Sequence, residues 1–523
     1  MKIIYKNKGG INKIIFLAFL GLILFTASCK KTTELRPLDS LSDQTAFDDK
    51  ASIELAMVGV YQQAAIGTYS GGAGRGYPFG AASIEQAEMR AEDMVNLQGF
   101  YQITYQATYS TSSANNVNHY ENLYNLINQA NIVIDGVRKA GASGVISQAS
   151  ANSYEGEARF IRALAHHELV LNFSKPYADG NGSKPGVPYR DIAISSTAAF
   201  DQASKIGRGT VADVYTKIIA DLNFAETNLS ASSTVYSRAT SGAAIALKTR
   251  VLLHKGDWAG VITEGAKLGT GSGSAFTSPV NGYKLTDKPD GPFANFSSNT
   301  ESIFSIANSA AANPDVNGAL ASMLLPASIG GRSLVSISPN LYNASFWLAG
   351  DLRKTLLLVP EDGIYYTNKY RDPVTKTDWS PIIRYAEVLL NVAEANARNG
   401  NGPQALALLN AVRNRSVPAA NVYTSAPADL LGAILNERRV EFAAEGRRWP
   451  DVHRLSLDPV YGLNGIPAKL NPGQVTAAAF ANGVQITPAR LTIAYTDFRF
   501  LWPFPLSEVN SNPLIKGQQN PGY

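Results

Sequence analysis

Residues 385 to 412 read YAEVLLNVAEANARNGNGPQALALLNAV, and this stretch decides the fold class. Apolar residues recur at the spacing of one helix face, stop at the turn Gly400-Asn401-Gly402-Pro403, and then resume at the same spacing. A helix, a tight turn and an antiparallel helix form the repeating unit of tetratricopeptide-like solenoids, whose helix pairs stack on neighbours to bury their apolar faces. The two predicted stripes are Tyr385, Val388, Leu389 and Val392, then Ala405, Leu408, Leu409 and Val412.

The same design occurs earlier in the chain. An amphipathic helix is predicted from Val211 to Leu229, and Thr210 with Asp213 forms a capping box at its start. Residues 243 to 254 and 259 to 268 form a second predicted helix pair, separated by a Gly-Asp turn. Further helices are expected at about 45–65, 116–139, 150–173 and 428–446. The fold class is therefore mainly α, with tetratricopeptide-like helical repeats in two separate parts of the chain, about 42–268 and 380–455.

Two other regions lose the helical period. Residues 270–380 and 456–523 are rich in Gly, Pro, Asn and Ser, and loops of this length in a compact protein are usually functional or carry short irregular elements. We expect a single globular domain over residues 42–523. In this domain we expect a discontinuous helical scaffold to support a loop-rich half.

The first 41 residues read as an export signal and a tether. Four lysines precede an apolar run over residues 14–25, which is too short to span a bilayer, and small residues lead to Cys29, the only cysteine in the chain. A disulfide would need a second cysteine, so a lipid attachment point explains Cys29 better than half of a disulfide. The alternative is an incidental free thiol. We predict a lipoprotein signal peptide at 1–28, acylation of Cys29 and a lipidated tether at 29–41.

Charge and composition exclude several classes of function. Removing residues 1–28 removes four lysines and no acid, so 46 basic and 42 acidic residues become 42 and 42, which gives no basic surface for nucleic acid. No later segment is long and apolar enough to be transmembrane. The five histidines do not have the spacing of metal ligands. His167-Glu168 begins like the zinc-protease helix motif, but that motif needs a second histidine at position 171, which is Leu171. We expect no metal and no cofactor.

Glu437, Glu441 and Glu445 are the best candidates for catalytic carboxylates, because glycosidases use paired acids. Their spacing of four residues places them on one helix face, with Arg438, Arg439, Arg447 and Arg448 close by to neutralise them. Structural ion pairing is the favoured interpretation.

Several segments together resemble the SusD/RagB family, and their order and number make the match specific. The resemblance implies a tetratricopeptide-containing helical fold and an outer-membrane lipoprotein, facing the exterior, that captures nutrients beside a SusC-like TonB-dependent transporter. The segments are EARFIRALA (157–165), RAT (238–240) running to GDW (256–258), RYAEVLL (384–390), ERRVEFAAEGRRW (437–449), PLSEV (505–509) and QNPGY (519–523).

Aromatic residues gather in two polar stretches, residues 69–109 and 340–350. Sugar rings stack their C–H faces on aromatic rings, while their hydroxyls need amide, guanidinium or acidic partners. Members of the resembled family bind ligand with equivalent loops. We predict a ligand site where the two segments meet, with Tyr77, Tyr101 and Trp347 as stacking surfaces and Arg90 and Asn96 as hydrogen-bonding groups. The other aromatic residues of these stretches are Tyr69, Phe79, Phe100, Tyr105, Tyr109, Tyr342 and Phe346.

The predicted function is a non-enzymatic binding protein that captures oligosaccharide or similar polymer fragments and hands them to the transporter. One alternative is a surface glycoside hydrolase or lyase on a helical scaffold, which would need two carboxylates converging in a cleft at about 5 to 10 Å. Another is a repeat scaffold that binds partner proteins. The ligand's identity does not follow from the sequence, because loop geometry sets specificity.

Overall fold

The computed structural model describes residues 45–72 and 74–523. The predicted signal peptide, Cys29 and tether lie outside the described residues. Within them, no helix is long and apolar enough to cross a bilayer. The helices up to residue 270 are α2 (Lys50–Ala65), α3 (Ala81–Met89), α4 (Gln102–Gln106), α5 (Ala114–Ala142), α6 (Gln148–Phe173), α7 (Thr197–Ala203), α8 (Val211–Asn228), α9 (Ser241–Lys255) and α10 (Trp258–Lys267).

The later helices are shorter, apart from one group of three. That group contains α15 (Tyr385–Arg398), α16 (Gly402–Arg413) and α17 (Leu430–Glu441). The short ones are α11 (Gly291–Ala294), α12 (Leu320–Leu324), α13 (Pro339–Tyr342), α14 (Leu352–Leu356), α18 (Arg448–Leu455), α19 (Ala477–Ala481), α20 (Leu506–Ser511) and α21 (Pro513–Lys516).

The caps and turns predicted for the helix pairs are present. Thr210 and Asp213 form the capping box of α8, because each side chain bonds the other residue's backbone N–H. Gly256 ends α9 at φ 77°, a left-handed conformation that glycine adopts without strain, and the chain turns back into α10. Local sequence therefore fixes where these helices begin and end.

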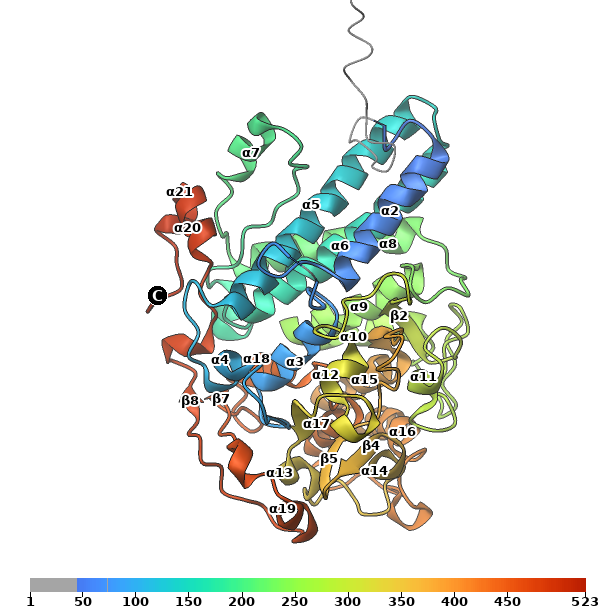
Figure 1. The fold of residues 1–523 in the computed structure, drawn as a ribbon. Coiled ribbons are helices and arrows are strands. Elements are labelled where there is room, and N and C mark those ends of the chain that lie inside the picture. The colour runs from blue at the N-terminus through green and yellow to red at the C-terminus, as the bar shows by residue number, and fades with distance from the viewer. Residues whose placement is uncertain (1–44, 73) are drawn as a thin grey trace, which may run out of the picture.

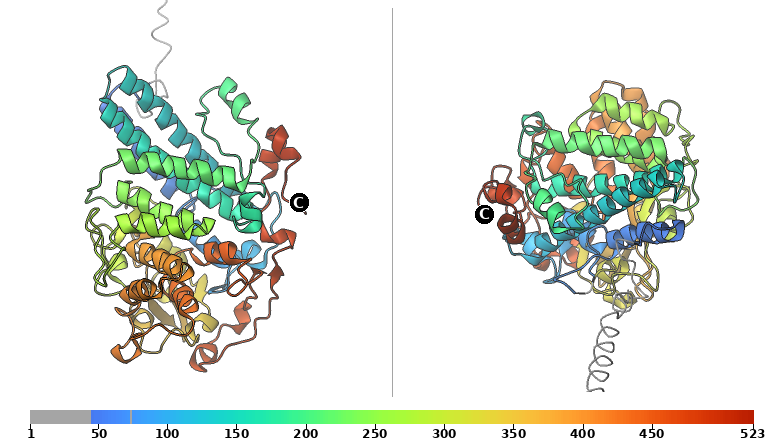
Figure 2. Two further views of the ribbon diagram at one scale, coloured as in Figure 1. Left: turned by 180° about the vertical axis from the view of Figure 1, so that it is seen from behind. Right: turned by 90° about the horizontal axis from the view of Figure 1, so that it is seen from above.

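The long helices stack in one continuous series. Helix α5 packs on α6, α6 on α8, α8 on α9, α9 on α10, α10 on α15 and α15 on α16. The contact between α10 and α15 joins parts of the chain that are more than 100 residues apart, and Figures 1 and 2 show the resulting rows of helices. The predicted mainly α fold, with a discontinuous tetratricopeptide-like scaffold, is confirmed.

The loop-rich part contains short strand pairs that the sequence pattern did not predict. Among the described residues, four two-stranded antiparallel pairs form, and three of them join segments that are not adjacent in sequence. The shortest strands have only two or three residues, too few to show an alternating pattern, and the five-residue strands are buried along their whole length. The pairs are β1 (Met94–Asn96) with β3 (Val335–Ile337), β2 (Ser302–Ile306) with β6 (Ser380–Arg384), β4 (Leu358–Glu361) with β5 (Ile364–Thr367), and β7 (Gly465–Ile466) with β8 (Ile493–Ala494).

Of the three apolar cores among the described residues, the two larger ones correspond to the two parts of the fold. The larger core fills the helical stack, and the second lies beneath the loop-rich part, where α3, β1 and α4 pack against α12, β3 and α13. Residues of the segments 69–109 and 320–347 thus share one apolar core. Pairing of Met94 with Ile337 and of Asn96 with Val335 sets their register.

Candidate functional site

The predicted stacking residues are buried. Tyr77, Tyr101 and Trp347 are 1%, 2% and 3% exposed, and all three belong to the second apolar core. None of them presents an open ring face to solvent, so the exposure expected from the polar surroundings is absent. The composition of a loop does not reveal which of its aromatic residues point inward.

The two predicted hydrogen-bonding residues are also inside the protein. Arg90 donates to Asn172 Oδ1 at 2.8 Å and to the Phe500 carbonyl at 2.6 Å, and its guanidinium lies 3.7 Å from the Trp449 ring centroid. Asn96 donates to the Gln98 carbonyl at 2.6 Å and to Gln102 Oε1 at 3.0 Å. Arg90 therefore joins distant segments, whereas Asn96 shapes the loop that follows β1.

Half-exposed side chains lie next to two of these buried rings. Tyr69 stacks on Tyr77 at 6.3 Å between ring centroids, and Phe100 meets Tyr101 edge to face at 5.4 Å. Arg75 lies 3.9 Å from the Tyr69 centroid and 5.4 Å from that of Phe100. We call Tyr69, Arg75, Phe100 and Arg332 the cation–aromatic cluster, since Arg332 lies 4.9 Å from the Phe100 ring.

Backbone packing fixes the loops that carry the cluster. A Cβ on Gly318 would lie 2.3 Å from the Arg75 carbonyl carbon, and one on Gly76 would lie 2.6 Å from the Gly318 carbonyl oxygen. Only glycine allows this approach, so the loop around Arg75 rests directly on the chain that leads to Arg332. Arg332 is held in turn by donating to Asn317 Oδ1 at 2.9 Å. The cluster is therefore preorganised, as a binding surface requires.

The charges of the cluster are not neutralised. Among the described residues, neither Arg75 nor Arg332 forms an ion pair with an acidic side chain. Glu85 lies near both Tyr101 and Arg332, but burial raises its pKa to about 8, with Tyr101 and Arg332 opposing the shift. Glu85 is therefore protonated at neutral pH. The two guanidinium groups remain available to polar or anionic ligand groups beside two aromatic rings.

Trp347 lines a separate open cleft of about 690 Å³. Tyr342 and Tyr365 stack there at 4.5 Å between centroids, Phe480 meets both, and Lys354 Nζ lies 4.3 Å from the Tyr342 ring. No residue of the segment 69–109 lines this cleft. The two predicted segments share a core, but their aromatic surfaces are distinct.

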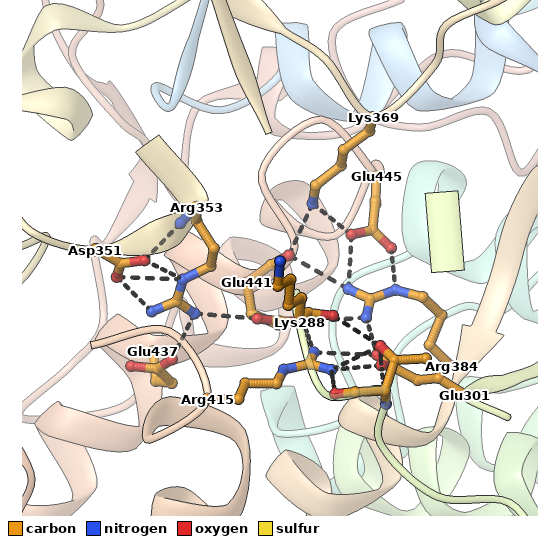
Figure 3. A network of polar contacts seen from close by, with 11 residues as sticks. Lys288, Glu301, Asp351, Arg353, Lys369, Arg384, Arg415, Glu437, Glu441 and Glu445 are labelled. Atoms are coloured by element: carbon orange, nitrogen blue, oxygen red, sulfur yellow. Dashed lines mark hydrogen bonds and ion pairs between the residues drawn. The ribbon is translucent and has the colours of Figure 1, made fainter. Parts of the chain in front are cut away.

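The glutamates considered for catalysis are neutralised inside the protein (Figure 3). Glu437 pairs with Arg353 at 2.5 Å, Glu445 pairs with Lys369 at 2.6 Å, and Glu441 contacts three arginines, including Arg415 at 2.7 Å. Burial alone would raise the pKa of Glu441, but Arg415, Arg384 and Arg353 hold it below its ordinary value. A general acid needs a raised pKa, so structural ion pairing, the favoured interpretation, is confirmed.

The two histidines of α6 are packing residues of the helical stack. His166 and His167 are 0% and 2% exposed on α6, and burial lowers the pKa of His167 to about 3. Within the described residues, no group of His, Cys, Asp and Glu has the arrangement of a metal site.

Two family models match separate parts of the chain. Residues 38–253 match a model described as "Starch-binding associating with outer membrane", and residues 357–523 match one described as "SusD family". The chain belongs to the SusD family. The family resemblance of the sequence segments is thereby confirmed, and the residues of the cation–aromatic cluster lie within the first match or between the two.

Individual SusD proteins are similar over most of the chain. A SusD superfamily protein from Bacteroides fragilis superposes with a TM-score of 0.73 at 26% identity, covering 90% of this chain and 99% of that one. A laminarin-binding SusD-like protein has a TM-score of 0.65 at 22% identity, covering 91% and 100%, which supports the fold alone. SusD-like protein P2 of Formosa agariphila is 27% identical over 61% of this chain and 68% of its own length.

The aromatic stretch predicted from the sequence contains two members of the cluster. Tyr69 and Phe100 belong to it, and each packs on one of the predicted stacking residues, Tyr77 and Tyr101 respectively. Arg75 stands in a glycine-rich loop whose only sequence signal is flexibility. Arg332 carries no sequence signal at all, because β1 and β3 bring it there across more than 200 residues.

Proposed function

We propose that this SusD-family protein binds glycans at the outer membrane, where it captures oligosaccharide and passes it to a SusC-like TonB-dependent transporter. The single observation that carries the proposal is the cation–aromatic cluster, a half-exposed and unneutralised set of rings and guanidinium groups. The family model described as starch-binding supports a carbohydrate ligand.

Each part of the cluster suits a different part of a sugar. The rings of Tyr69 and Phe100 offer apolar faces for C–H groups, and stacking of this kind contributes about 0.5 to 1.5 kcal/mol beyond area burial. The guanidinium groups of Arg75 and Arg332 donate to hydroxyl oxygens. Tyr77 and Tyr101 support the two exposed rings from below, and Asn96 shapes the loop of Phe100. Loops that are already rigid lose little entropy on binding.

The residue types that form these two surfaces fit capture of a glycan without cleavage. Neither the cluster nor the Trp347 cleft contains an Asp or Glu side chain among the described residues that form it. Hydrolysis of a glycosidic bond would need two converging carboxylates there. The proposal therefore has no cofactor and no chemical step, and the hydrolase or lyase remains the alternative.

A glycan panel with product analysis tests the proposal. The purified domain is expected to bind one class of oligosaccharide and to leave its chain length unchanged after prolonged incubation. Chain shortening that disappears when one acidic residue is replaced would assign the protein to the enzyme class. Binding of no glycan, with capture of soluble proteins instead, would favour the scaffold alternative.

The membrane anchor and the transporter need separate tests. Cys29→Ala is expected to release the protein from the membrane, because several acyl chains on one cysteine, at about 0.8 kcal/mol per methylene, hold a soluble domain there. Purification from membranes is expected to recover a TonB-dependent barrel with the wild-type protein. An unmodified Cys29 thiol in the native protein would contradict the anchor, and a preparation without any barrel would contradict the partnership.

A further inference from the structure

A cleft of about 470 Å³ lies where the C-terminal segment meets α4. Its walls come from Tyr105 and Gln106 on one side and from the chain on either side of β7 and β8 on the other, and Figure 1 shows β7 and β8 beside α4. Three of its lining residues are cations, Lys469, Arg490 and Arg499, and none is acidic.

Lys469 and Arg490 lie opposite each other on two neighbouring backbone segments that line the cleft. Their N–H groups donate to each other's carbonyl oxygens at 3.1 and 3.0 Å, as an antiparallel bridge. Opposite residues of such a bridge project their side chains to the same side, and like charges in this position destabilise the protein. The arrangement places two cations side by side, where a counter-ion would be stabilising.

Within the part of the chain that the structure describes, no acidic side chain forms an ion pair with Lys469 or Arg490, and Glu92 acts on Lys469 only through its nearby charge. Within the described residues, Arg490 forms no ion pair, and its buried Nε–H has no hydrogen-bond partner. Lys469 is 4% exposed and donates only to the carbonyl oxygens of Met89 and Tyr105. Burial lowers the pKa of Lys469 to about 7, so a bound anion would favour its charged form. Arg499, by contrast, is already paired with Asp497 at 2.7 Å.

The cleft also has an aromatic and an apolar wall. Lys469 Nζ and the Arg490 guanidinium lie 4.9 and 5.9 Å from the Tyr105 ring centroid. Ile466, Leu491 and Ile493 contribute apolar surface to the lining. A site of this kind fits a compact oxyanion on a larger organic body better than a free, fully hydrated ion.

We propose that this cleft binds the carboxylate or sulfate group of an acidic oligosaccharide, with Arg490 as the principal donor and Lys469 beside it. The nature of the carrier rests on the proposed glycan-binding function, whereas the oxyanion site itself does not. The cleft shares no residue with the cation–aromatic cluster, so it forms a second contact for a captured glycan. Because this contact needs an oxyanion, it would favour acidic glycans among those that the protein captures.

Inorganic sulfate tests the oxyanion site without any glycan. At constant ionic strength, about 10 mM sulfate in place of chloride is expected to raise the melting temperature of the wild-type protein by about 2 °C. Arg490→Gln should lose this increase in melting temperature. The matched control Lys217→Gln should keep it; this variant removes a lysine of α8 that lies beside the Tyr189 ring. In chloride alone, Arg490→Gln should melt no lower than wild type, because it relieves the repulsion with Lys469.

An equal sulfate shift in wild type and Arg490→Gln would overturn the site, since sulfate also stabilises proteins without binding. A lower melting temperature of Arg490→Gln in chloride would instead show that Arg490 has a structural role, which also counts against the site.

A pair of saccharides that differ only in charge tests the carrier. Tetragalacturonate and its fully methyl-esterified form have the same backbone, and the wild-type protein is expected to bind the acid about tenfold more tightly. Arg490→Gln should bind both forms equally, and Arg490→Lys should retain part of the preference. A sulfate shift that depends on Arg490, together with equal affinity for acid and ester, would overturn the saccharide and leave a free oxyanion as the ligand. If neither saccharide binds, the acidic saccharide is overturned as the carrier, while the sulfate result still decides the oxyanion site.

Discussion

Phe100 and Tyr101 are sequence neighbours with opposite surroundings. Tyr101 is 2% exposed in the apolar core, whereas Phe100 is half-exposed between Arg75 and Arg332. Tyr69 and Tyr77 differ in the same way. The candidate site is thus defined by which member of each pair points outward, and its energetics can be tested one side chain at a time.

Phe100→Ala is expected to weaken glycan affinity about tenfold, from the lost stacking and the lost buried area together. The matched control is Phe224→Ala, which removes a half-exposed ring of α8. The Arg159 guanidinium lies 4.2 Å from the centroid of the Phe224 ring. Calorimetry on both folded variants provides the measurement. Equal affinities of the two variants would show that Phe100 is an incidental surface residue.

Glu85 gives the protein a predictable pH dependence. Burial raises its pKa from the ordinary value of 4.5 to about 8 in the folded protein. Between these values the folded state keeps a proton that the unfolded chain has released, so stability falls as pH rises from about 5 to 8. Glu85→Gln cannot ionise and should therefore gain melting temperature relative to wild type as the pH rises. Glu121→Gln, on an exposed carboxyl, is the control, and a pH-independent difference for Glu85→Gln would contradict the assignment.

At the scale of elements, helices followed from the sequence and strands did not. The stripe from Tyr385 to Val392 and the capping box of Thr210 are local signals, so they predict α15 and α8 without knowledge of the rest. β1 and β3 are three-residue strands that form only because distant chain segments meet. The same reason explains why the sequence does not indicate Arg332. It also explains why the predicted site joins Trp347 to the segment 69–109, although the two lie on different surfaces.

Gly318 holds two site loops together, so its replacement should affect both stability and binding. A Cβ there would lie 2.3 Å from the Arg75 backbone, and overpacking of this kind costs about 1 to 3 kcal/mol. Gly318→Ala is expected to lower the melting temperature and to weaken glycan binding by displacing Arg75. Gly99→Ala, where a Cβ meets nothing within 4 Å, should leave stability nearly unchanged. The prediction is wrong if Gly318→Ala behaves like Gly99→Ala.

The buried ionic network joins β6 to α17 and the turn that follows it. Arg384 contacts Glu301, Glu441 and Glu445, and its guanidinium is 2% exposed. Arg384→Ala would leave these carboxylates short of a partner inside the protein, which typically costs about 3 to 5 kcal/mol. Lys139→Ala, which breaks an exposed pair with Asp135, should cost less than about 1 kcal/mol. Denaturant unfolding of both variants compares the two, and similar losses would show that the network contributes little.

At the scale of the whole molecule, a rigid helical stack carries a smaller loop-rich part that presents the candidate surfaces (Figures 1 and 2). The stack gives the loops a fixed support, and the ion pairs of Figure 3 tie β6, α17 and the loops between them into one unit. This division explains how one fold can serve many ligands, because the loops determine specificity while the scaffold stays constant. Family membership fixes the scaffold, and the ligand remains a property of the loops.

A crystal structure of the protein with the oligosaccharide that binds most tightly in the glycan panel tests the central claim most directly. The account predicts a sugar ring stacked on Tyr69 or Phe100, with Arg75 or Arg332 within hydrogen-bond distance of its oxygens. The glycan should be of full length. An oligosaccharide bound only elsewhere on the protein, with the cation–aromatic cluster open to solvent, would contradict the account.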